Sequence, residues 1–201
     1  MSVDVPMPPS IRRLPLTRAG YPVPAVSPRG DMTDTFDIVD LPQTGLTAVC
    51  PCEDVRQPYK LGAMCPDKQR RTMRRGRCGV CGRHIDPRTG LLFVRLDTTT
   101  DIWVEPPLHP RCMAYSLQAC PVLAKETAAH GEVLLCHRVE LRERRETLGP
   151  HRDGRLHYRY FPLGDPDARR FGALGYLAAR PVNPTVHPAP YWREHLAPAL
   201  T

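Results

Sequence analysis

Four residues in two short pairs could bind a metal ion. Two residues separate Cys78 from Cys81, and two residues separate His109 from Cys112. Thiolate sulfur and neutral imidazole are the ligands that Zn²⁺ prefers, and two such pairs complete a tetrahedral site with no open position for a reacting water. The pattern therefore predicts one structural Zn²⁺. Its binding free energy, about 10–16 kcal/mol in comparable fingers, would count toward folding.

The sequence around the two pairs predicts the elements that would position them. The glycines within Cys78–Gly82 allow the tight turn of a zinc knuckle, with backbone N–H groups directed at sulfur. Leu91–Leu96 and Ile102–Val104 are rich in strand formers and flank a polar turn, which predicts a β-hairpin. Pro106 and Pro107 block a helix, so the next helix is expected to begin near Pro110. Knuckle, hairpin and helix in this order predict a treble-clef-like zinc module.

Five further cysteines remain outside this set. The predicted helix continues over 113–129 with a kink at Pro121, and Cys120 lies eight residues beyond Cys112, about 12 Å along an ideal helix. Cys120 is therefore too far away to bind the same ion, and is either a core thiol or part of a second site. The number of thiols predicts a candidate second metal site, with iron–sulfur as a variant. Its candidate ligands are Cys50, Cys52 and Cys65, together with Cys120 or Cys136.

Cysteine usage depends on the compartment. The first thirty residues contain no apolar run of signal-peptide type, and no stretch of about 18 apolar residues could cross a bilayer. We therefore expect a cytoplasmic protein, in which thiols stay reduced and available to metal.

The composition predicts a small α+β fold with a limited core. Hydrophobic residues make up 41% and aromatic residues 6% of the chain, and 24 prolines are spread along it. Such a chain needs a metal or a similar cross-link for stability. The expected divisions are an extended N-terminal arm (1–48), a cysteine group with a basic run (49–77), the zinc module (78–129), strands and a helix packed on it (130–180), and a proline-rich tail (181–201).

The segment 130–180 carries its own patterns. Alternating apolar residues in Glu132–Leu141 and β-formers in Arg155–Leu163 predict two strands. Asp165-Pro166 resembles a helix start, which predicts a helix reaching about Arg180. The residues after it are expected to lie on the surface.

A basic run precedes the knuckle. The chain has a formal net charge of +7 and a pI of about 9.2, with 25 Arg and 3 Lys. The planar guanidinium suits phosphate, so the run predicts a polyanionic partner, although a genome rich in G and C would produce the same arginine excess. The candidate phosphate-binding residues are Lys68, Arg70, Arg71, Arg74, Arg75 and Arg77.

Two resemblances follow from these motifs. The segment Arg77–Cys112, with GRCGVCGRHI and LHPRC, resembles the zinc finger of poly(ADP-ribose) polymerases and a DNA ligase, which recognises DNA breaks. That resemblance implies a similar finger with a basic edge that faces phosphates.

The second resemblance spans most of the chain. The knuckle, Glu105-Pro106-Pro107 with His109 and Cys112, and Ala119-Cys120-Pro121 resemble a family of small uncharacterised zinc-finger-like proteins of actinomycetes and their phages. This resemblance implies zinc binding, and it implies no particular reaction.

Three functions fit these observations. The first is a non-enzymatic zinc protein that binds DNA or RNA through the basic run. The second is a protein-interaction factor, such as a phage product that captures a host protein with its hairpin and proline-rich arms. The third is a treble-clef metal-dependent nuclease, for which His84, His130 and His137 are the available bases. No catalytic motif is present, so we expect no catalytic residues.

Overall fold

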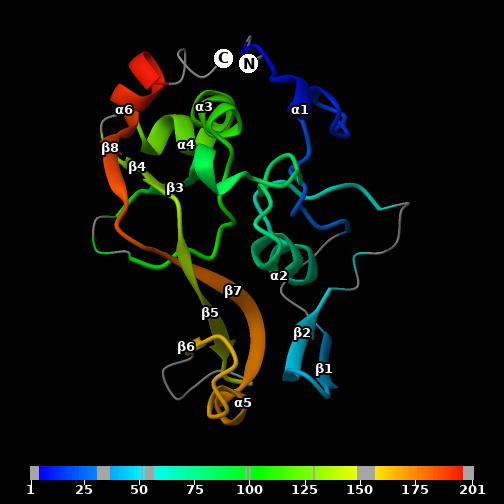
Figure 1. Cartoon of the computed structure of the whole chain (residues 1–201). Helices are drawn as coiled ribbons and strands as arrows, with labels where there is room; N and C mark the ends of the chain where they lie inside the picture. Colours follow the sequence, from blue (N-terminus) through cyan, green and yellow to red (C-terminus); the bar gives the residue numbers. More distant parts are fainter. Residues whose placement is uncertain are drawn as a thin grey trace.

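The computed structural model describes residues 5–30, 37–50, 52, 57–97, 99, 101–128, 130–148 and 157–196. Of residues 195 and 196 it describes the backbone alone. These residues form a small α+β fold in which two curled sheets carry several short helices (Figure 1). The α+β class expected from the sequence is confirmed. The strands are β1 (Asp37–Leu41), β2 (Gly45–Val49), β3 (Leu91–Arg95), β4 (Glu132–Cys136), β5 (Val139–Glu146), β6 (Tyr158–Pro162), β7 (Ala173–Pro181) and β8 (Thr185–Pro188).

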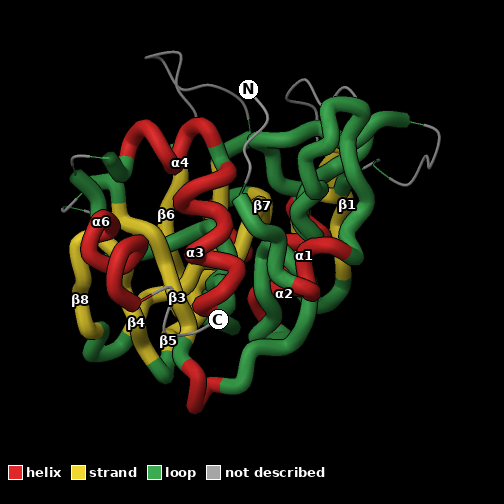
Figure 2. Tube along the Cα trace, turned by 90° about the horizontal axis from the view of Figure 1, so that it is seen from above, coloured by secondary structure: helices red, strands yellow, loops and turns green. Residues whose placement is uncertain are grey.

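The helices are short and most begin with proline, whose missing N–H is unpaired at a helix start in any case. They are α1 (Pro9–Arg12), α2 (Pro66–Arg74), α3 (Pro110–Ala119), α4 (Pro121–Glu126), α5 (Ala168–Phe171), α6 (Ala189–Tyr191), the 3-10 turn η1 (Pro87–Thr89) and the π-helical turn η2 (Trp192–Leu196). In the view of Figure 2, α3 and α4 follow one another above the strands, and α1 and α2 lie to one side. The kink expected at Pro121 is a break between α3 and α4.

A two-stranded ribbon runs through both sheets. The five-stranded sheet has the order β1-β2-β7-β5-β6, and the three-stranded sheet has the order β3-β4-β8. β4 leads into β5 and β7 leads into β8, so the antiparallel pairs β4·β8 and β5·β7 continue one another. At the bend, the Val182 N–H donates to the Arg138 carbonyl at 3.0 Å. The strand predicted over 132–141 is thus present as β4 and the start of β5, and the strand predicted near 155–163 is present as β6.

The helix predicted from 165 to 180 is wrong. α5 covers only four residues, and the chain then forms β7, which is buried along most of its length. Gly172 lies between the two elements. A larger residue would not fit there, because a Cβ at this position would lie 2.2 Å from the Glu146 carbonyl oxygen at the end of β5. Small and apolar side chains on both faces suit β7 to a central position in the sheet.

A buried arginine ties β5 to its surroundings. Arg145 is 1% exposed and pairs with Glu143 at 2.7 Å. Its guanidinium also donates to the carbonyls of Thr44 and Gly172, at 2.7 and 3.1 Å. The Glu143 carboxylate compensates the buried charge, and the two carbonyls accept hydrogen bonds from the guanidinium. The contact with Thr44 also holds the β1–β2 turn against β5.

The predicted hairpin is also wrong. β3 pairs with β4, and the residue that returns beside it is Leu108, whose N–H and carbonyl both bond to Leu92. Trp103 instead forms a bridge with Ala179 of β7, while its indole N–H donates to the Val94 carbonyl at 2.6 Å. The segment after β3 therefore links the two sheets.

The N-terminal segment packs on the core instead of forming a free arm. Ile11, Val23 and Val26 are buried, at 0%, 2% and 7% exposure, and the Ala25 N–H donates to the Val80 carbonyl at 2.8 Å. β1 and β2 also belong to this stretch. Proline favours an extended chain, and the buried side chains of Ile11, Val23 and Val26 hold that chain against the protein.

The C-terminal segment does not trail over the surface either. β8 pairs with β4 in the order Val133↔His187 and Leu134↔Val186. Ala189 and Trp192 are 0% and 2% exposed and pack with residues of α3, β3 and β4 in a second apolar cluster. Among the residues that the structure describes, no helix has the length and apolar character needed to span a bilayer.

Replacing Trp192 by alanine tests this packing. We expect Trp192→Ala to lower the free energy of unfolding by about 3–5 kcal/mol, because it removes a large buried aromatic side chain. Tyr191→Ala, at a neighbouring residue that is 47% exposed, should change it by about 0.5 kcal/mol. Chemical denaturation of both variants measures the difference, and equal effects would contradict the packing described here.

Candidate metal centre and the surface beside it

The knuckle forms as a tight turn before α3. The Gly82 N–H donates to the Cys78 carbonyl at 2.9 Å, and the Cys78 N–H donates to the Arg83 carbonyl at 2.8 Å. Gly82 has φ +70°, and a Cβ there would lie 3.1 Å from the Ala25 side chain. Both facts favour glycine after the second cysteine. The turn directs Cys78 and Cys81 to the same side.

The other pair lies at the start of α3. His109 is the N-cap residue with extended backbone, Pro110 is the first helical residue, and Cys112 follows within the first turn. The helix start expected near Pro110 is therefore confirmed. The Gly79 N–H donates to the Pro107 carbonyl at 3.0 Å, which fixes the knuckle beside the helix start.

The four side chains converge on one point. One ligand atom from each of Cys78, Cys81, His109 and Cys112 lies within 4.8 Å of the other three. An ion bound to sulfur at about 2.3 Å in a tetrahedron places its ligands about 3.7 Å apart, so the spacing fits such an ion. Cys78 and Cys112 are fully buried, and Cys81 is 9% exposed. The group is a closed candidate metal site.

The imidazole of His109 is oriented for binding. Its Nε2 lies 3.0 Å from the His84 carbonyl, and its Nδ1 lies 3.4 Å from Cys81 Sγ. A carbonyl oxygen can only accept, so Nε2 carries a proton, and Nδ1 is the ring nitrogen that faces the sulfurs. A second-layer hydrogen bond of this kind sets the tautomer of metal-binding histidines.

The sulfurs and the imidazole compete for protons. Contacts with the Cys112 and Cys78 thiols lower the pKa of Cys81 well below its ordinary value, and contacts with Cys78 and Cys81 raise the pKa of Cys112. Hydrogen bonds with Cys78 and Cys81 raise the pKa of His109 to about 10. Binding of a metal cation in place of these protons is therefore favoured in such a group.

Residues from the N-terminal segment cover the site, which the sequence did not indicate. Ile11 belongs to the same buried cluster as Cys78, Cys81 and Cys112, and Ser10 Oγ lies 3.8 Å from Cys112 Sγ. The only local signal was the Pro-Pro-Ser start of α1, which predicts a helical turn but not its neighbour.

A second group of thiols lies at the start of α2. The sulfurs of Cys50, Cys52 and Cys65 lie within 4.8 Å of one another, and Cys52 and Cys65 are 3.4 Å apart. Burial raises the pKa of Cys65 and, together with the other two thiols, that of Cys50. Burial opposes ionisation of Cys52 as well, but its contacts with Cys50 and Cys65 lower its pKa. This group is a second candidate metal site.

Cys120 and Cys136 belong to neither group. Within the described part of the chain, no cluster of three or more metal-binding side chains includes them. Cys120 lies between α3 and α4 and lines a cavity, and Cys136 is 1% exposed in the core beside β3. The expectation that one of them completes the second site is therefore wrong, because the strand pairing places Cys136 in the core instead.

The basic run divides between two roles. Arg70 is 8% exposed, pairs with Asp67 at 2.6 Å and donates to the Gly175 carbonyl at 2.6 Å, so it belongs to the contact between α2 and β7. The half-buried Lys68 donates to the Ser27 carbonyl at 2.7 Å. The remaining four side chains are exposed: Arg71, Arg74, Arg75 and Arg77.

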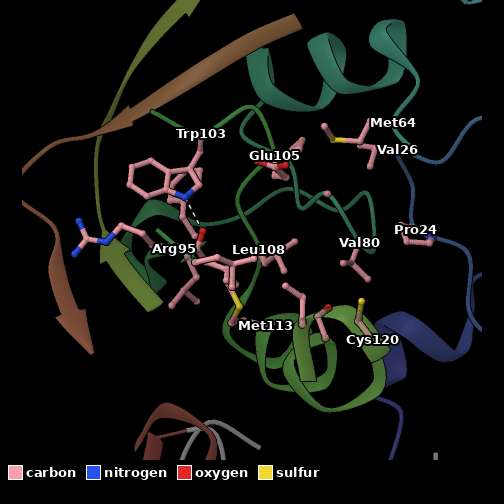
Figure 3. Close-up of a pocket in the computed structure, with 18 of the residues that line it drawn as sticks. Pro24, Val26, Met64, Val80, Arg95, Trp103, Glu105, Leu108, Met113 and Cys120 are labelled. Carbon is pink, nitrogen blue, oxygen red and sulfur yellow. Dashed lines mark hydrogen bonds between the residues drawn. The ribbon is translucent and has the colours of Figure 1, made fainter. Parts of the chain in front are cut away.

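A cavity of about 510 Å³ lies between the N-terminal segment, the knuckle and α3 (Figure 3). Its lining is mostly apolar, and Arg95 and Glu105 are among its charged residues. Apolar residues that line it include Val26, Met64, Val80, Trp103, Leu108 and Met113. The size matches the range of small-molecule and side-chain pockets.

Comparison of the chain with protein-family models, with curated proteins and with solved structures gave no match.

The four-ligand group can be tested by single substitutions. Cys81→Ser should release the metal ion bound there and unfold the region around the knuckle, because the remaining three ligands hold a divalent ion far less tightly. Cys120→Ser should leave that ion bound, since this thiol lies outside the group. Elemental analysis and circular dichroism measure both effects. A wild-type protein that is folded but contains no metal ion at the four-ligand group would contradict the assignment.

The division of the basic run predicts unequal effects on stability. Arg70→Ala should lower the free energy of unfolding by about 2–3 kcal/mol, because it removes charge-assisted hydrogen bonds in a buried contact. Arg74→Ala, on the exposed face of the same helix, should change it by about 0.5 kcal/mol. Urea denaturation of the two variants provides the measurement. Similar losses in both would place Arg74 in a structural contact too.

Proposed function

We propose that this protein is a non-enzymatic zinc-binding protein that binds nucleic acid through the arginine edge, defined as Arg71, Arg74, Arg75 and Arg77. Three sulfurs and one imidazole in a closed group favour Zn²⁺ in a structural role. A knuckle followed by a helix that supplies the last two ligands supports a treble-clef-like arrangement, although its strand pairing differs from a simple hairpin.

The observation that carries the nucleic-acid proposal is the exposed face of α2. Arg71, Arg74 and the C-cap residue Arg75 are spaced as i, i+3 and i+4, so they lie on one side of the end of α2, and Arg77 follows after Gly76. The opposite face, with Gln69 and Arg70, is buried. Among the described residues, no carboxylate forms an ion pair with the arginine edge. Exposed guanidinium groups without a carboxylate partner are suited to phosphates.

The position of the edge supports the same proposal. It directly precedes the knuckle, and the resemblance of Arg77–Cys112 to a finger that recognises DNA breaks implies a phosphate-facing edge at this place. The net charge of +7 adds a general attraction for polyanions. Contacts to phosphate alone give little sequence preference, so we expect sequence-tolerant binding to DNA or RNA.

A nuclease is less well supported. The metal ligands enclose the first site, and a nuclease needs an open metal position and a base. His84 Nδ1 lies 3.2 Å from the Arg75 carbonyl, and His137 Nδ1 lies 2.7 Å from the Pro87 carbonyl. Both rings therefore already bond to backbone near the surface.

Salt dependence tests the nucleic-acid proposal. Each phosphate contact releases condensed counterion, so four contacts should give a log–log slope of about −3.6 on duplex DNA and about −2.8 on a single strand. Arg74→Ala together with Arg75→Ala should flatten the duplex slope by about 1.8 and weaken all sequences alike. Fluorescence anisotropy at several salt concentrations measures the slope.

A matched control removes two charges elsewhere. Arg88 and Arg170 are 91% and 86% exposed, and each pairs with its own carboxylate, Asp86 and Asp167. Replacing both by alanine lowers the net charge equally but should leave the slope unchanged. Equal flattening of the slope in both variants would show that net charge alone drives binding. An unchanged slope in all three proteins would show that these arginines do not contact phosphate. Either result would overturn the assignment to the arginine edge.

Protein interaction is the second candidate, and the cavity favours it. Its apolar walls could receive an apolar side chain from a partner protein, in the manner of groove-binding peptides. This function predicts little nucleic-acid binding at about 0.15 M salt and no change of slope in the arginine variants. The salt experiment therefore separates the two candidates.

A further inference from the structure

Three cysteines from different parts of the chain meet at the start of α2. Cys50 follows the end of β2, Cys52 comes two residues later, and Cys65 is the residue that precedes the first turn of α2. Their sulfurs lie within 4.8 Å of one another, and none of the three forms a disulfide. Cys50 and Cys52 are half-buried and Cys65 is 1% exposed. The group is compact but has an open side.

The backbone supports negative charge on these sulfurs. The N–H of Cys52 faces Cys50, the N–H of Arg29 faces Cys52, and the N–H of Lys68 faces Cys65. N–H groups directed at sulfur are also expected around the knuckle of the first site. One such donor for each sulfur is the arrangement that metal-bound thiolates need.

The fold brings further positive charge to the group. Cys65 lies at the N-terminus of α2, where the helix dipole is positive. Lys68 lies in the first turn, and its positive charge favours the thiolate form of Cys52. Three thiolates with one divalent ion carry a net charge of −1, which these groups offset.

We propose that Cys50, Cys52 and Cys65 bind a second thiophilic divalent cation, Zn²⁺ being the physiological candidate, and leave its fourth position to a ligand from outside this group. Within the described residues, no fourth His, Cys, Asp or Glu side chain joins the three sulfurs. Asp67 lies nearby, but it accepts from the Cys50 N–H at 2.7 Å and pairs with Arg70. Three protein ligands with an exchangeable fourth are the arrangement of reactive zinc sites.

The second ion would cross-link segments that are far apart in the sequence. Residues 26–30 run beside residues 58–65, through the bonds Cys65 N–H to Val26 O, Lys60 N–H to Pro28 O and Gly30 N–H to Pro58 O. The ion would join this pair of segments to the end of β2. The inference depends on the thiol geometry and does not depend on nucleic-acid binding.

Metal stoichiometry tests the proposal. Reduced wild-type protein purified with zinc present should hold two ions by mass spectrometry of the native protein. Cys52→Ser should hold one, and it is the variant of choice because Cys52 is half-buried and follows the end of β2. Cys136→Ser, which removes a thiol outside both groups, should hold two. Loss of the first site would lower the count in all three proteins alike, whereas absence of the second site would abolish the difference between wild type and Cys52→Ser, so failure at one site is separable from failure at the other.

A measurement on the unaltered protein guards against a variant that does not fold. A chromophoric chelator added to zinc-loaded wild-type protein should remove the ions in two phases, because the three-ligand site exchanges faster than the closed one. One ion in both wild type and Cys52→Ser, or a single release phase, would overturn the proposal. So would a Cys52–Cys65 disulfide in protein prepared under reducing conditions, detected by alkylation and peptide mapping.

Discussion

The convergence of three sulfurs and one imidazole is the constraint on which the rest of the structure depends. Cys78 and Cys81 lie in the knuckle, and His109 and Cys112 lie at the start of α3, so the two halves of the module meet at this point. The surrounding buried cluster adds Ile11 from the N-terminus and residues of β3 and β7. In a chain with 6% aromatic residues, a metal ion bound there would supply cohesion that a larger apolar core would otherwise provide.

α2 connects the centre of the fold to its surface. On one face, Gln69 bonds to both the N–H and the carbonyl of Leu177 in β7, and Arg70 reaches the Gly175 carbonyl. The other face exposes arginines to solvent. Residues of the same type therefore serve different purposes one position apart, because the helical period of 3.6 places Arg70 and Arg71 on different faces. The rigid attachment to β7 would hold the exposed face in a constant position.

Features that follow from local rules were predictable from the sequence. The turn after Cys78 depends on adjacent glycines, the start of α3 depends on Pro110, and the break at Pro121 depends on the missing N–H of proline. The strand patterns of 132–141 and 158–162 were also recognisable, since β-formers and alternation are properties of neighbouring residues. The triad Cys50, Cys52 and Cys65 was named among five candidates, but nothing in the sequence excluded Cys120 and Cys136.

The tertiary structure decided which segments are partners. The backbone of Trp103 pairs with β7, the chain after Gly172 forms a strand beside β5, and Trp192 packs against α3 and β4. It also turned Arg70 inward. The sequence by itself determined the metal-binding pairs and their turns, because both depend on residues a few positions apart. Strand pairing, burial and the choice of thiols depend on residues tens of positions apart, whose contacts exist only after the whole chain has folded.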